Sequence, residues 1–596
     1  MLRSHAYSAY PASLSKDYQE IVEGYRRAGI QRLGLLVAST GKLLCTPETM
    51  RALKEKLAAD NIEAFALVYG IGHPMGKGFY TDKNGHLPEG EIFYDGPFIM
   101  PEANNYLFAL TRGWRHQVND NGLAVHSAAC PDAACIEGNE KVIRAVAQVF
   151  DDVWYDDEAR MDGDQGAGTQ YSTAACYCDA CLADLGKRLG RTVTRDDVLH
   201  VQAIHDAWVD QKTDKMAAWW QHICVAGRET NSNLRLGLMV RWGGEERDGI
   251  DMDKLLPHFG GRVNLRAGEG HFSNNEYELP ECQVIEHLAA SGHVSWFPQS
   301  VRVLTETTFS PGVNFIKKVA LGLAAGASEP AYYPGIPPSE AWRKLVATDL
   351  APVRRWADVF AEKTAAHGAI HILRSPAAGR GNCGPVKRIQ DRRPFPLFGL
   401  AGLYSMVVRQ GHWRDTGKEQ VLAVTGRSVW DFKLGELGRR MLVLDGHALL
   451  EGSPLNDAIG IRNVQKAEAG RVTFEADGFK ADGCLLVRDQ IILVPYTWQD
   501  IPAADLESVL RDIRRVIGPE LESVVVEGDT HVLPVHYRYQ EHDAIMLANL
   551  TTERRCISLR LPDERVQLKG LDDQPLDASL TLAPEEIRVV LARAIP

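Results

Sequence analysis

The sequence has no long apolar run and no excess of positive charge. No stretch approaches the ~18 consecutive apolar residues that a membrane-spanning helix needs, so we expect no transmembrane segment. Its 78 acidic residues outnumber its 66 basic ones, and the formal net charge of -12 argues against nucleic acid or an anionic membrane as the main partner. The first residues also lack the apolar core of a signal peptide. These absences favour a cytoplasmic protein.

Internal repeats, low-complexity tracts and a glycine-rich phosphate loop are missing too. Because no dinucleotide-binding fingerprint follows the first apolar run, we expect no organic cofactor. The 11 cysteines lie in a chain of 596 residues without a secretory signal, which indicates reduced thiols or a metal site rather than a disulfide framework. The length predicts more than one domain.

Apolar runs recur through the first part of the chain, after a short extended start and a helix predicted over Lys16–Ala28. Each run leads into a polar loop and a helix pattern, which is typical of parallel strand–helix units. About eight such units predict a closed (β/α)8 TIM barrel rather than an open doubly wound sheet. The predicted strands are Arg32–Ala38, Glu63–His73, Leu123–Cys130, Val149–Glu158, Arg235–Trp242, Val263–Glu269, Val301–Glu306 and Ala327–Tyr333.

Ionisable and aromatic residues gather where these strands end. In a barrel of this kind the carboxyl ends of the strands face the substrate. Any single residue there is equally consistent with a salt bridge at the rim, but the whole set predicts a binding pocket. The set comprises His73, His126, Asp157, Glu158, Arg160, Arg241, Trp242, Arg266, Glu269, His271 and Glu306.

Glu158 and Glu306 have the chemistry needed to cleave a glycosidic bond. One carboxyl group protonates the leaving oxygen, and a second attacks the anomeric carbon or activates water. We assign the acid/base role to Glu158, which ends the fourth predicted strand, and the nucleophile role to Glu306, which ends the seventh. Asp157 competes with Glu158, because alternation along a strand turns only one of the two inward. Glu269 competes for the second role, and retention or inversion stays open.

Cationic and aromatic neighbours fit a sugar site. Trp242 can stack on a pyranose face. Arg160, Arg241 and Arg266 can pair with a carboxylate on the substrate, since a guanidinium group matches its shape. They predict an acidic sugar, unless they serve only to neutralise the acids before Arg160.

A cysteine cluster follows the fourth predicted strand. Cys176, Cys178 and Cys181 offer three soft ligands close together, and a structural zinc needs four. Cys130 or Cys135 is the source of the fourth. With four positions filled, such a zinc would be structural, because no position is left for water. Reduced thiols without metal are the alternative.

The remaining chain divides in two. We assign the barrel to residues 1–365, with a helix over Asp349–Ala365 leading away from it. Residues 366–525 alternate strands and helices, including a helix over Phe398–Gln410, and predict a second α/β domain. Residues 526–596 are short strands separated by turns, typical of a small antiparallel β-sandwich. We interpret it as a structural cap, with carbohydrate binding as the alternative.

Together these residues resemble glycoside hydrolase family 42, the β-galactosidases. Asp156-Asp157-Glu158 is similar to the family's Asp-Asn-Glu, which contains the acid/base, and Glu306 corresponds to its nucleophile. Asp157 replaces the asparagine that helps to bind the sugar 2-hydroxyl. Some members bind zinc through one cysteine and a Cys-x-Cys-x-x-Cys, which Cys130 and the three later cysteines resemble.

The resemblance also implies the nature of the second domain. It resembles the flavodoxin-like, amidotransferase-like domain that follows the barrel in the family and supports trimers. An amidotransferase needs a cysteine nucleophile at a strand-to-helix turn, and Asp445-Gly446-His447 stands there instead. We therefore expect a non-catalytic domain and a homo-oligomer, either a dimer or a trimer.

The sequence predicts a cytoplasmic glycosidase that removes a terminal sugar from a small oligosaccharide or glycoside. One alternative is a lyase or metal-dependent hydrolase on the same barrel, using His73, His126 and His271. Another is a sugar-binding protein that has kept the barrel without catalysis.

Overall fold

The structure is a computed structural model, and it describes most but not all of the chain. The described residues are 5–71, 93–94, 110–122, 124–155, 159–161, 175–240, 245–267, 302–305, 313–325, 329–332, 340–344, 363–366, 370–384, 396–401, 404–409, 421–517, 525–539, 542–561 and 566–594, with isolated positions between 327 and 359.

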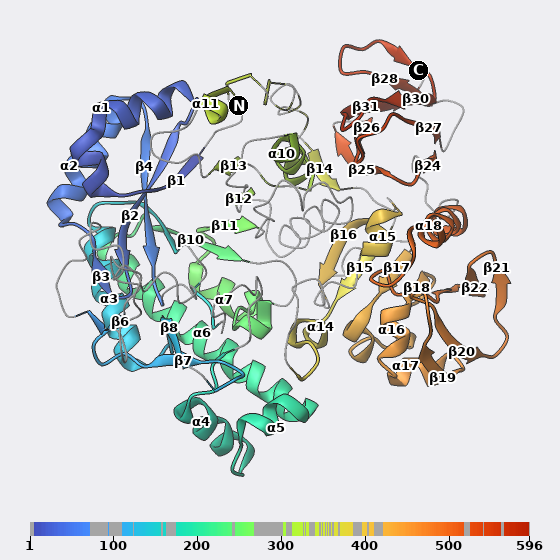
Figure 1. The fold of residues 1–596 in the computed structure, drawn as a ribbon, viewed down its shortest axis with the longest axis horizontal. Coiled ribbons are helices and arrows are strands. Elements are labelled where there is room, and N and C mark those ends of the chain that lie inside the picture. Colours follow the sequence, from blue (N-terminus) through green and yellow to red (C-terminus); the bar gives the residue numbers. More distant parts are fainter. Residues whose placement is uncertain are drawn as a thin grey trace, which may run out of the picture.

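The first half is a closed barrel of parallel strands (Figure 1). The sheet runs β1-β13-β12-β11-β10-β9-β4-β2-β3, and β1 also pairs with β2, which closes it. β3 is a two-residue antiparallel addition to β2, so eight parallel strands form the ring. Their bounds, with that of β3, are β1 His5–Ala9, β2 Arg32–Ser39, β3 Lys42–Leu43, β4 Glu63–Tyr69, β9 Asp152–Tyr155, β10 Arg235–Val240, β11 Val263–Ala267, β12 Arg302–Thr305 and β13 Glu329–Tyr332.

Helices between the strands cover the outside of the barrel (Figure 1). Local sequence sets their starts: the side chains of Thr46, Asp132 and Asp251 accept backbone hydrogen bonds at the first turns of α2, α3 and α7. The helices are α1 Pro11–Arg27, α2 Pro47–Ala59, α3 Ala133–Ala147, α6 Gln202–Thr230, α7 Met252–Phe259, α10 Val313–Ala325 and α11 Glu340–Lys344.

One barrel strand was missed and one predicted barrel strand is wrong. The first barrel strand is His5–Ala9, which the sequence suggested only as an extended start because HAYSA is short and weakly apolar. The run Leu123–Cys130 contains β8, Ala124–Ala129, which pairs antiparallel with β7, His116–Val118, outside the barrel. The two errors offset each other, so Val149–Glu158 still contains the fourth barrel strand, and the seventh is β12.

A helical excursion separates the fourth strand from α6. It contains α4, Asp179–Leu189, and α5, Arg195–His200, which begins with a capping box between Thr194 and Asp197. Figure 1 shows this pair projecting below the barrel, and its buried side chains pack against Trp208 of α6.

The second half begins with a mixed sheet in the order β16-β15-β17-β18-β23-β22-β21. The first five strands are parallel, as in an open α/β sheet, and the last two are antiparallel. The helix predicted over Phe398–Gln410 is wrong: α15 ends at Leu400 and Tyr404–Arg409 is a strand. The elements are β15 Ile370–Arg374, α14 Pro376–Arg380, α15 Pro396–Leu400, β16 Tyr404–Arg409, β17 Val421–Val424, β18 Met441–Asp445, α16 Gly446–Leu450, α17 Pro454–Ala458, β19 Ile461–Lys466, β20 Val472–Ala476, β21 Lys480–Asp482, β22 Leu485–Arg488, β23 Ile491–Val494 and α18 Ala503–Ile517.

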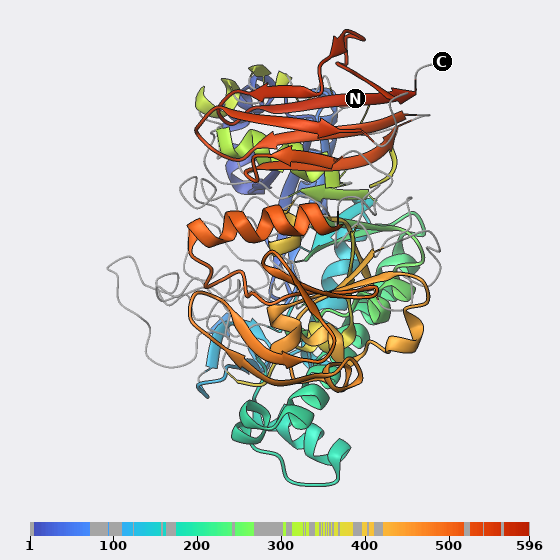
Figure 2. The same ribbon diagram turned by 90° about the vertical axis from the view of Figure 1, so that its right-hand side faces the viewer.

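The C-terminal residues form two antiparallel sheets that share an apolar core. One sheet runs β14-β25-β26-β31-β28-β29 and the other β24-β27-β30. β14, Lys363–Ala366, lies in the segment expected to be helical and pairs with β25. Figure 2 shows α18 between these sheets and the second α/β unit. The strands are β24 Val525–Gly528, β25 Val532–Tyr539, β26 His542–Asn549, β27 Arg555–Arg560, β28 Val566–Lys569, β29 Pro575–Leu576, β30 Ser579–Leu582 and β31 Ile587–Ala594.

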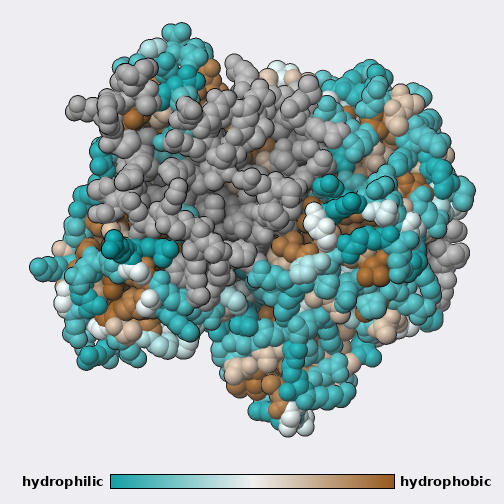
Figure 3. Space-filling view, turned by 180° about the vertical axis from the view of Figure 1, so that it is seen from behind, coloured by the Kyte–Doolittle hydropathy of each residue, from teal (hydrophilic) through white to brown (hydrophobic). Residues whose placement is uncertain are grey.

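On the face that Figure 3 shows, the described surface is mainly hydrophilic. In Figure 3 hydrophobic residues lie in separate patches on the visible face. Within the described part of the chain, no helix combines the length and the apolar character needed to cross a membrane.

Candidate functional site

An ion pair crosses the interior of the barrel near the start of its strands. Arg32 Nη2 lies 2.5 Å from Asp152 Oδ2, and Asn264 Nδ2 donates to Asp152 Oδ1 at 3.0 Å. These residues come from β2, β9 and β11, which are not neighbours in the sheet. Side chains from non-adjacent strands can meet only inside the ring, so Asp152 points inward.

Trp154 fills the next level of the interior. It packs with Leu36, Phe65 and other side chains of β2 and β4. Its register partner on β10 is Gly237, where an added Cβ would lie 2.2 Å from the indole ring. Tyr155 points the other way and contacts Trp219 and Trp220 of α6. Along β9, residues 152 and 154 therefore face inward, and residue 155 faces outward.

Arg266 lies within this interior. It is fully buried on β11, and its guanidinium contacts the sulfur of Met239, its register partner on β10. Leu304 is its register partner on β12. Arg266 thus belongs to the same inward set as Trp154, and the next residue but one after Leu304 in the chain is Glu306.

Most of the predicted site residues fall outside the described part of the chain. Among the predicted substrate-binding residues, Arg160 and Arg266 do lie in the described part, and both are buried. His126 lies on β8, where only the backbone is described. The predicted site residues that fall outside the described part are His73, Asp157, Glu158, Arg241, Trp242, Glu269, His271 and Glu306.

The segment that follows Glu158 is held at two successive residues. The Arg160 carbonyl accepts a hydrogen bond from Gln117 Nε2 at 3.2 Å, and Met161 N donates to Asp248 O at 2.7 Å. Gln117 lies on β7, and Asp248 ends the short helix η3, Glu245–Asp248, after β10. Sequence reasoning missed Gln117 because no motif marks a glutamine on a short hairpin strand.

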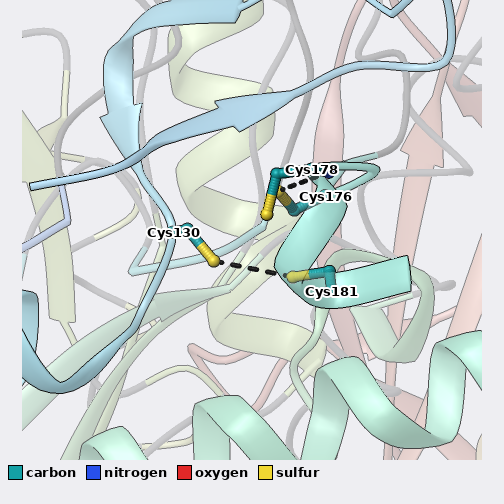
Figure 4. Close-up of side chains that lie close together, drawn as sticks. All are labelled: Cys130, Cys176, Cys178 and Cys181. Carbon is teal, nitrogen blue, oxygen red and sulfur yellow. Dashed lines mark hydrogen bonds between the residues drawn. The ribbon is translucent and has the colours of Figure 1, made fainter. Parts of the chain in front are cut away.

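The cysteine cluster is assembled as a four-sulfur site. Cys130, Cys176, Cys178 and Cys181 are buried, and their sulfur atoms all lie within 4.8 Å of one another. Figure 4 shows the four side chains converging, with Cys130 Sγ 3.6 Å from Cys181 Sγ. Cys135 lies apart on α3 and does not belong to the group.

The size of this site fits a tetrahedral ion. Zinc–sulfur bonds of about 2.3 Å place tetrahedral sulfurs about 3.8 Å apart. Backbone N–H groups of Val118 and Cys178 donate to Cys176 Sγ at 3.3 and 3.4 Å, as in sites where thiolates carry charge. Hydrogen bonds from the Cys130 and Cys176 thiols hold the pKa of Cys178 below its usual value.

Lys215 supplies positive charge at the edge of the cluster. Its Nζ lies 3.3 Å from Cys181 Sγ and 3.3 Å from Asp184 Oδ2. Burial lowers its pKa, but the charges of Cys181 and Cys130 outweigh burial, so the pKa of Lys215 is raised. A charged lysine offsets part of the negative charge that four thiolates bring.

The second α/β unit has an aspartate where an amidotransferase would carry its nucleophile. Asp445 lies at the sharp turn from β18 to α16 and is fully buried. Its Oδ1 accepts from Ala448 N at 2.9 Å and its Oδ2 from the Thr425 hydroxyl at 2.6 Å. Burial raises its pKa to about 7. Oδ1 thus caps α16, and Oδ2 binds the residue that follows β17, so both oxygens have a partner.

Comparison with known proteins identifies this fold. No family model and no curated protein matches the chain. Among solved structures, the GH42 β-galactosidase Gan42B of G. stearothermophilus superposes with a TM-score of 0.66 at 12% identity, covering 99% of this chain and 98% of that one. The β-galactosidase of Bacillus circulans sp. alkalophilus gives 0.64 at 10% identity, covering 100% and 99%. Isoenzyme 2 of the α-L-fucosidase from Paenibacillus thiaminolyticus gives 0.62 at 12% identity, covering 99% of each chain. Over its whole length the chain is therefore a distant structural relative of the GH42 β-galactosidases, and it shares their fold.

Proposed function

We propose that the protein is a glycoside hydrolase that removes a terminal sugar from a small oligosaccharide or glycoside. The observation that carries the proposal is the closed parallel barrel, in which the fourth and seventh strands lead directly into acidic residues of the chain. In such barrels the carboxyl ends of the strands hold the catalytic groups. The neighbours named β-galactosidase and α-L-fucosidase support the same reaction class.

The alternation on β9 favours Glu158 over Asp157 as the acid/base. Asp152 and Trp154 face inward, and Glu158 shares their parity, whereas Asp157 shares that of the outward Tyr155. Glu306 has the parity of Leu304, the register partner of the inward Arg266. Glu269 lies three residues after Arg266 and therefore has the opposite parity. The alternation thus supports Glu306 over Glu269.

In the proposed reaction Glu158 protonates the leaving oxygen, and Glu306 attacks the anomeric carbon. Deprotonated Glu158 then activates the water that releases the sugar. Trp242 provides a stacking face, while His73, His126 and His271 bind hydroxyl groups. Arg160, Arg241 and Arg266 make an acidic sugar the substrate to test first.

The cysteine cluster holds a structural zinc in this proposal. Four thiolates in a closed tetrahedral site suit zinc and leave no position for catalytic water. The metal joins Cys130, after β8, to the start of α4, and so fixes the hairpin beside the barrel. The second α/β unit and the C-terminal sheets serve packing and contacts between subunits of a homo-oligomer.

The test is hydrolysis of a panel of aryl galactosides, fucosides, glucosides and uronides by the wild type, Glu158→Gln and Glu306→Gln. Each variant should fold and lose about 10²–10⁴-fold in kcat on the same sugar. Asp157→Asn and Glu269→Gln are the matched controls. Turnover that survives Glu306→Gln but not Glu269→Gln would move the nucleophile, and no turnover on any glycoside would remove the proposed function.

A further inference from the structure

We infer that Gln117 is a positioning residue that couples the cysteine cluster to the segment carrying the acid/base. This inference rests on the proposed function, because it assigns the acid/base role to Glu158. Gln117 is fully buried on β7. The hydrogen bonds of its side chain to described residues go to backbone carbonyls, so it acts through the backbone on both sides.

One amide group bridges two backbone carbonyls. Gln117 Nε2 donates to Ala129 O at 2.9 Å and to Arg160 O at 3.2 Å. Carbonyl oxygens only accept, so the NH2 group must face them and spend both of its hydrogens. Ala129 directly precedes Cys130, and Arg160 is the second residue after Glu158. The Gln117 side chain therefore holds the backbone at Ala129 and the backbone at Arg160 together.

The hairpin strand of Gln117 is itself tied to the cluster. Val118 N donates to Cys176 Sγ at 3.3 Å, and Cys130 N donates to Arg115 O at 2.8 Å. Gln117 stands between these two attachment points in the chain. Any change in the spacing of the sulfurs must therefore shift the strand from which the amide reaches Arg160.

On the other side, the held segment has little freedom. Arg160 O is fixed by Gln117, and the next residue, Met161, donates from its backbone N to Asp248 O at 2.7 Å. Ala159, Arg160 and Met161 are all buried. A general acid displaced by about 1 Å can lose on the order of 100-fold in rate, so this anchor bears on catalysis and not only on folding.

Loss of the anchor has a specific kinetic signature. Proton donation matters most for poor leaving groups, because activated aryl groups depart without it. A misplaced Glu158 should thus lower kcat/KM on alkyl glycosides or disaccharides by about 10-fold or more, with little effect on kcat/KM for dinitrophenyl glycosides. The ratio kcat/KM covers the steps up to departure of the leaving group, so it separates proton donation by Glu158 from its later role as base.

The test compares Gln117→Met with Gln211→Met in the full-length, metal-loaded protein. Gln211 is also a buried glutamine at the cluster, and its Nε2 donates to Cys181 O at 2.9 Å, but no hydrogen bond links its side chain to residues 159–161. Both variants remove one buried amide beside the metal. Zinc content, thermal midpoint, and kcat and KM on a poor and an activated leaving group are measured for both, with Glu158→Gln as reference.

We expect Gln117→Met, like Glu158→Gln, to lose kcat/KM selectively on the poor leaving group, while Gln211→Met keeps the wild-type ratio of the two kcat/KM values. If Gln117→Met does not fold, Gln117→Asn retains the amide on a side chain shorter by one methylene and should show a smaller selective loss. If Glu158→Gln shows the selective loss and neither Gln117 variant does, this inference is wrong, whereas the acid/base assignment stands. Absence of the selective loss from Glu158→Gln as well overturns the acid/base assignment and this inference with it.

Discussion

Glu246 and Arg374 form a buried ion pair that joins the barrel to the second α/β unit. Arg374 Nη1 lies 2.8 Å from Glu246 Oε1, and Nη2 contacts the other oxygen. The two side chains are only 9% and 6% exposed. Gly379 leaves room for the carboxylate, since a Cβ there would lie 2.1 Å from Glu246 Oε2. This pair fixes how η3, beside the segment after Glu158, meets β15.

Replacing Glu246 with glutamine should destabilise the contact between the two units. It leaves the Arg374 charge buried without its counter-charge, a loss of about 3–5 kcal/mol. The midpoint of the first thermal unfolding transition should fall by several degrees. Asp210→Asn is the control: it breaks a half-exposed pair with Arg380, which should cost at most ~1 kcal/mol. Equal small shifts in both variants would contradict a structural role for the buried pair.

Arg514 lies on α18, the helix between the second unit and the C-terminal sheets in Figure 2, and it links the two. Its buried guanidinium donates to carbonyls on both sides, among them Ala401 O and, at 3.2 Å, Val532 O. Burial lowers its pKa to about 10, so it stays charged at neutral pH. The carbonyl oxygens take the place of water around the guanidinium, which has no carboxylate within hydrogen-bond distance among the described residues.

Arg514→Met should therefore loosen the C-terminal sheets. Several carbonyls lose their donor, at about 1–3 kcal/mol for each group left unsatisfied. Limited proteolysis should release a C-terminal fragment faster than from the wild type. Arg511→Met, at an exposed position on the same helix that bonds only Ser508 among the described residues, should leave the rate unchanged. Unchanged proteolysis of Arg514→Met would show that apolar packing alone holds the sheets.

The sequence predicted the barrel more reliably than its individual strands. Parallel strands covered on both faces are continuous apolar runs, and this pattern located β2, β4, β9, β10, β11, β12 and β13. It missed β1 because HAYSA carries too few apolar residues to form such a run. It misassigned Leu123–Cys130 because an apolar hairpin strand has the same composition as a barrel strand. Over Phe398–Gln410, a short apolar stretch fits helix and strand periodicity equally well.

The site could be predicted only where residues lie close together in sequence. The close spacing of Cys176, Cys178 and Cys181 predicts a metal site. The structure places Cys130, and not Cys135, with them as the fourth cysteine. Gln117 and Lys215 carry no such signal. Their roles depend on which backbone carbonyl or sulfur lies a few ångströms away, and sequence spacing does not encode that distance.

His205 should make stability fall with acid. It is fully buried on α6, and its Nε2 lies 3.1 Å from Arg380 O, to which the neutral ring donates. Burial and the nearby Arg247 charge lower its pKa to about 3. Unfolded histidine takes a proton near pH ~6.5, so stability is full above that value and is lost as pH falls towards ~3, by at most ~1.4 kcal/mol per pH unit.

The check is the unfolding midpoint of wild type, His205→Gln and His222→Gln at about pH 7.5 and about pH 5. His205→Gln keeps a donor for Arg380 O but cannot titrate, so its midpoint should drop less between the two conditions. His222, on the same helix, is 52% exposed and should leave the wild-type dependence intact. If the unfolding midpoint of His205→Gln falls in acid as much as that of the wild type, the loss of stability comes from carboxylates instead.

Lys215→Met should weaken retention of the proposed zinc while leaving the cysteines in place. Removing the ammonium leaves the charge of Cys181 uncompensated at 3.3 Å, and loss of such a partner typically costs about 10–100-fold in affinity. Transfer of zinc to a coloured chelator should be faster by that order. Lys187→Met removes the other lysine that pairs with Asp184, from a position whose side chain is 80% exposed, and should match the wild type. Equal transfer rates in both variants would mean that the N–H donors of Val118 and Cys178 suffice to hold the thiolates.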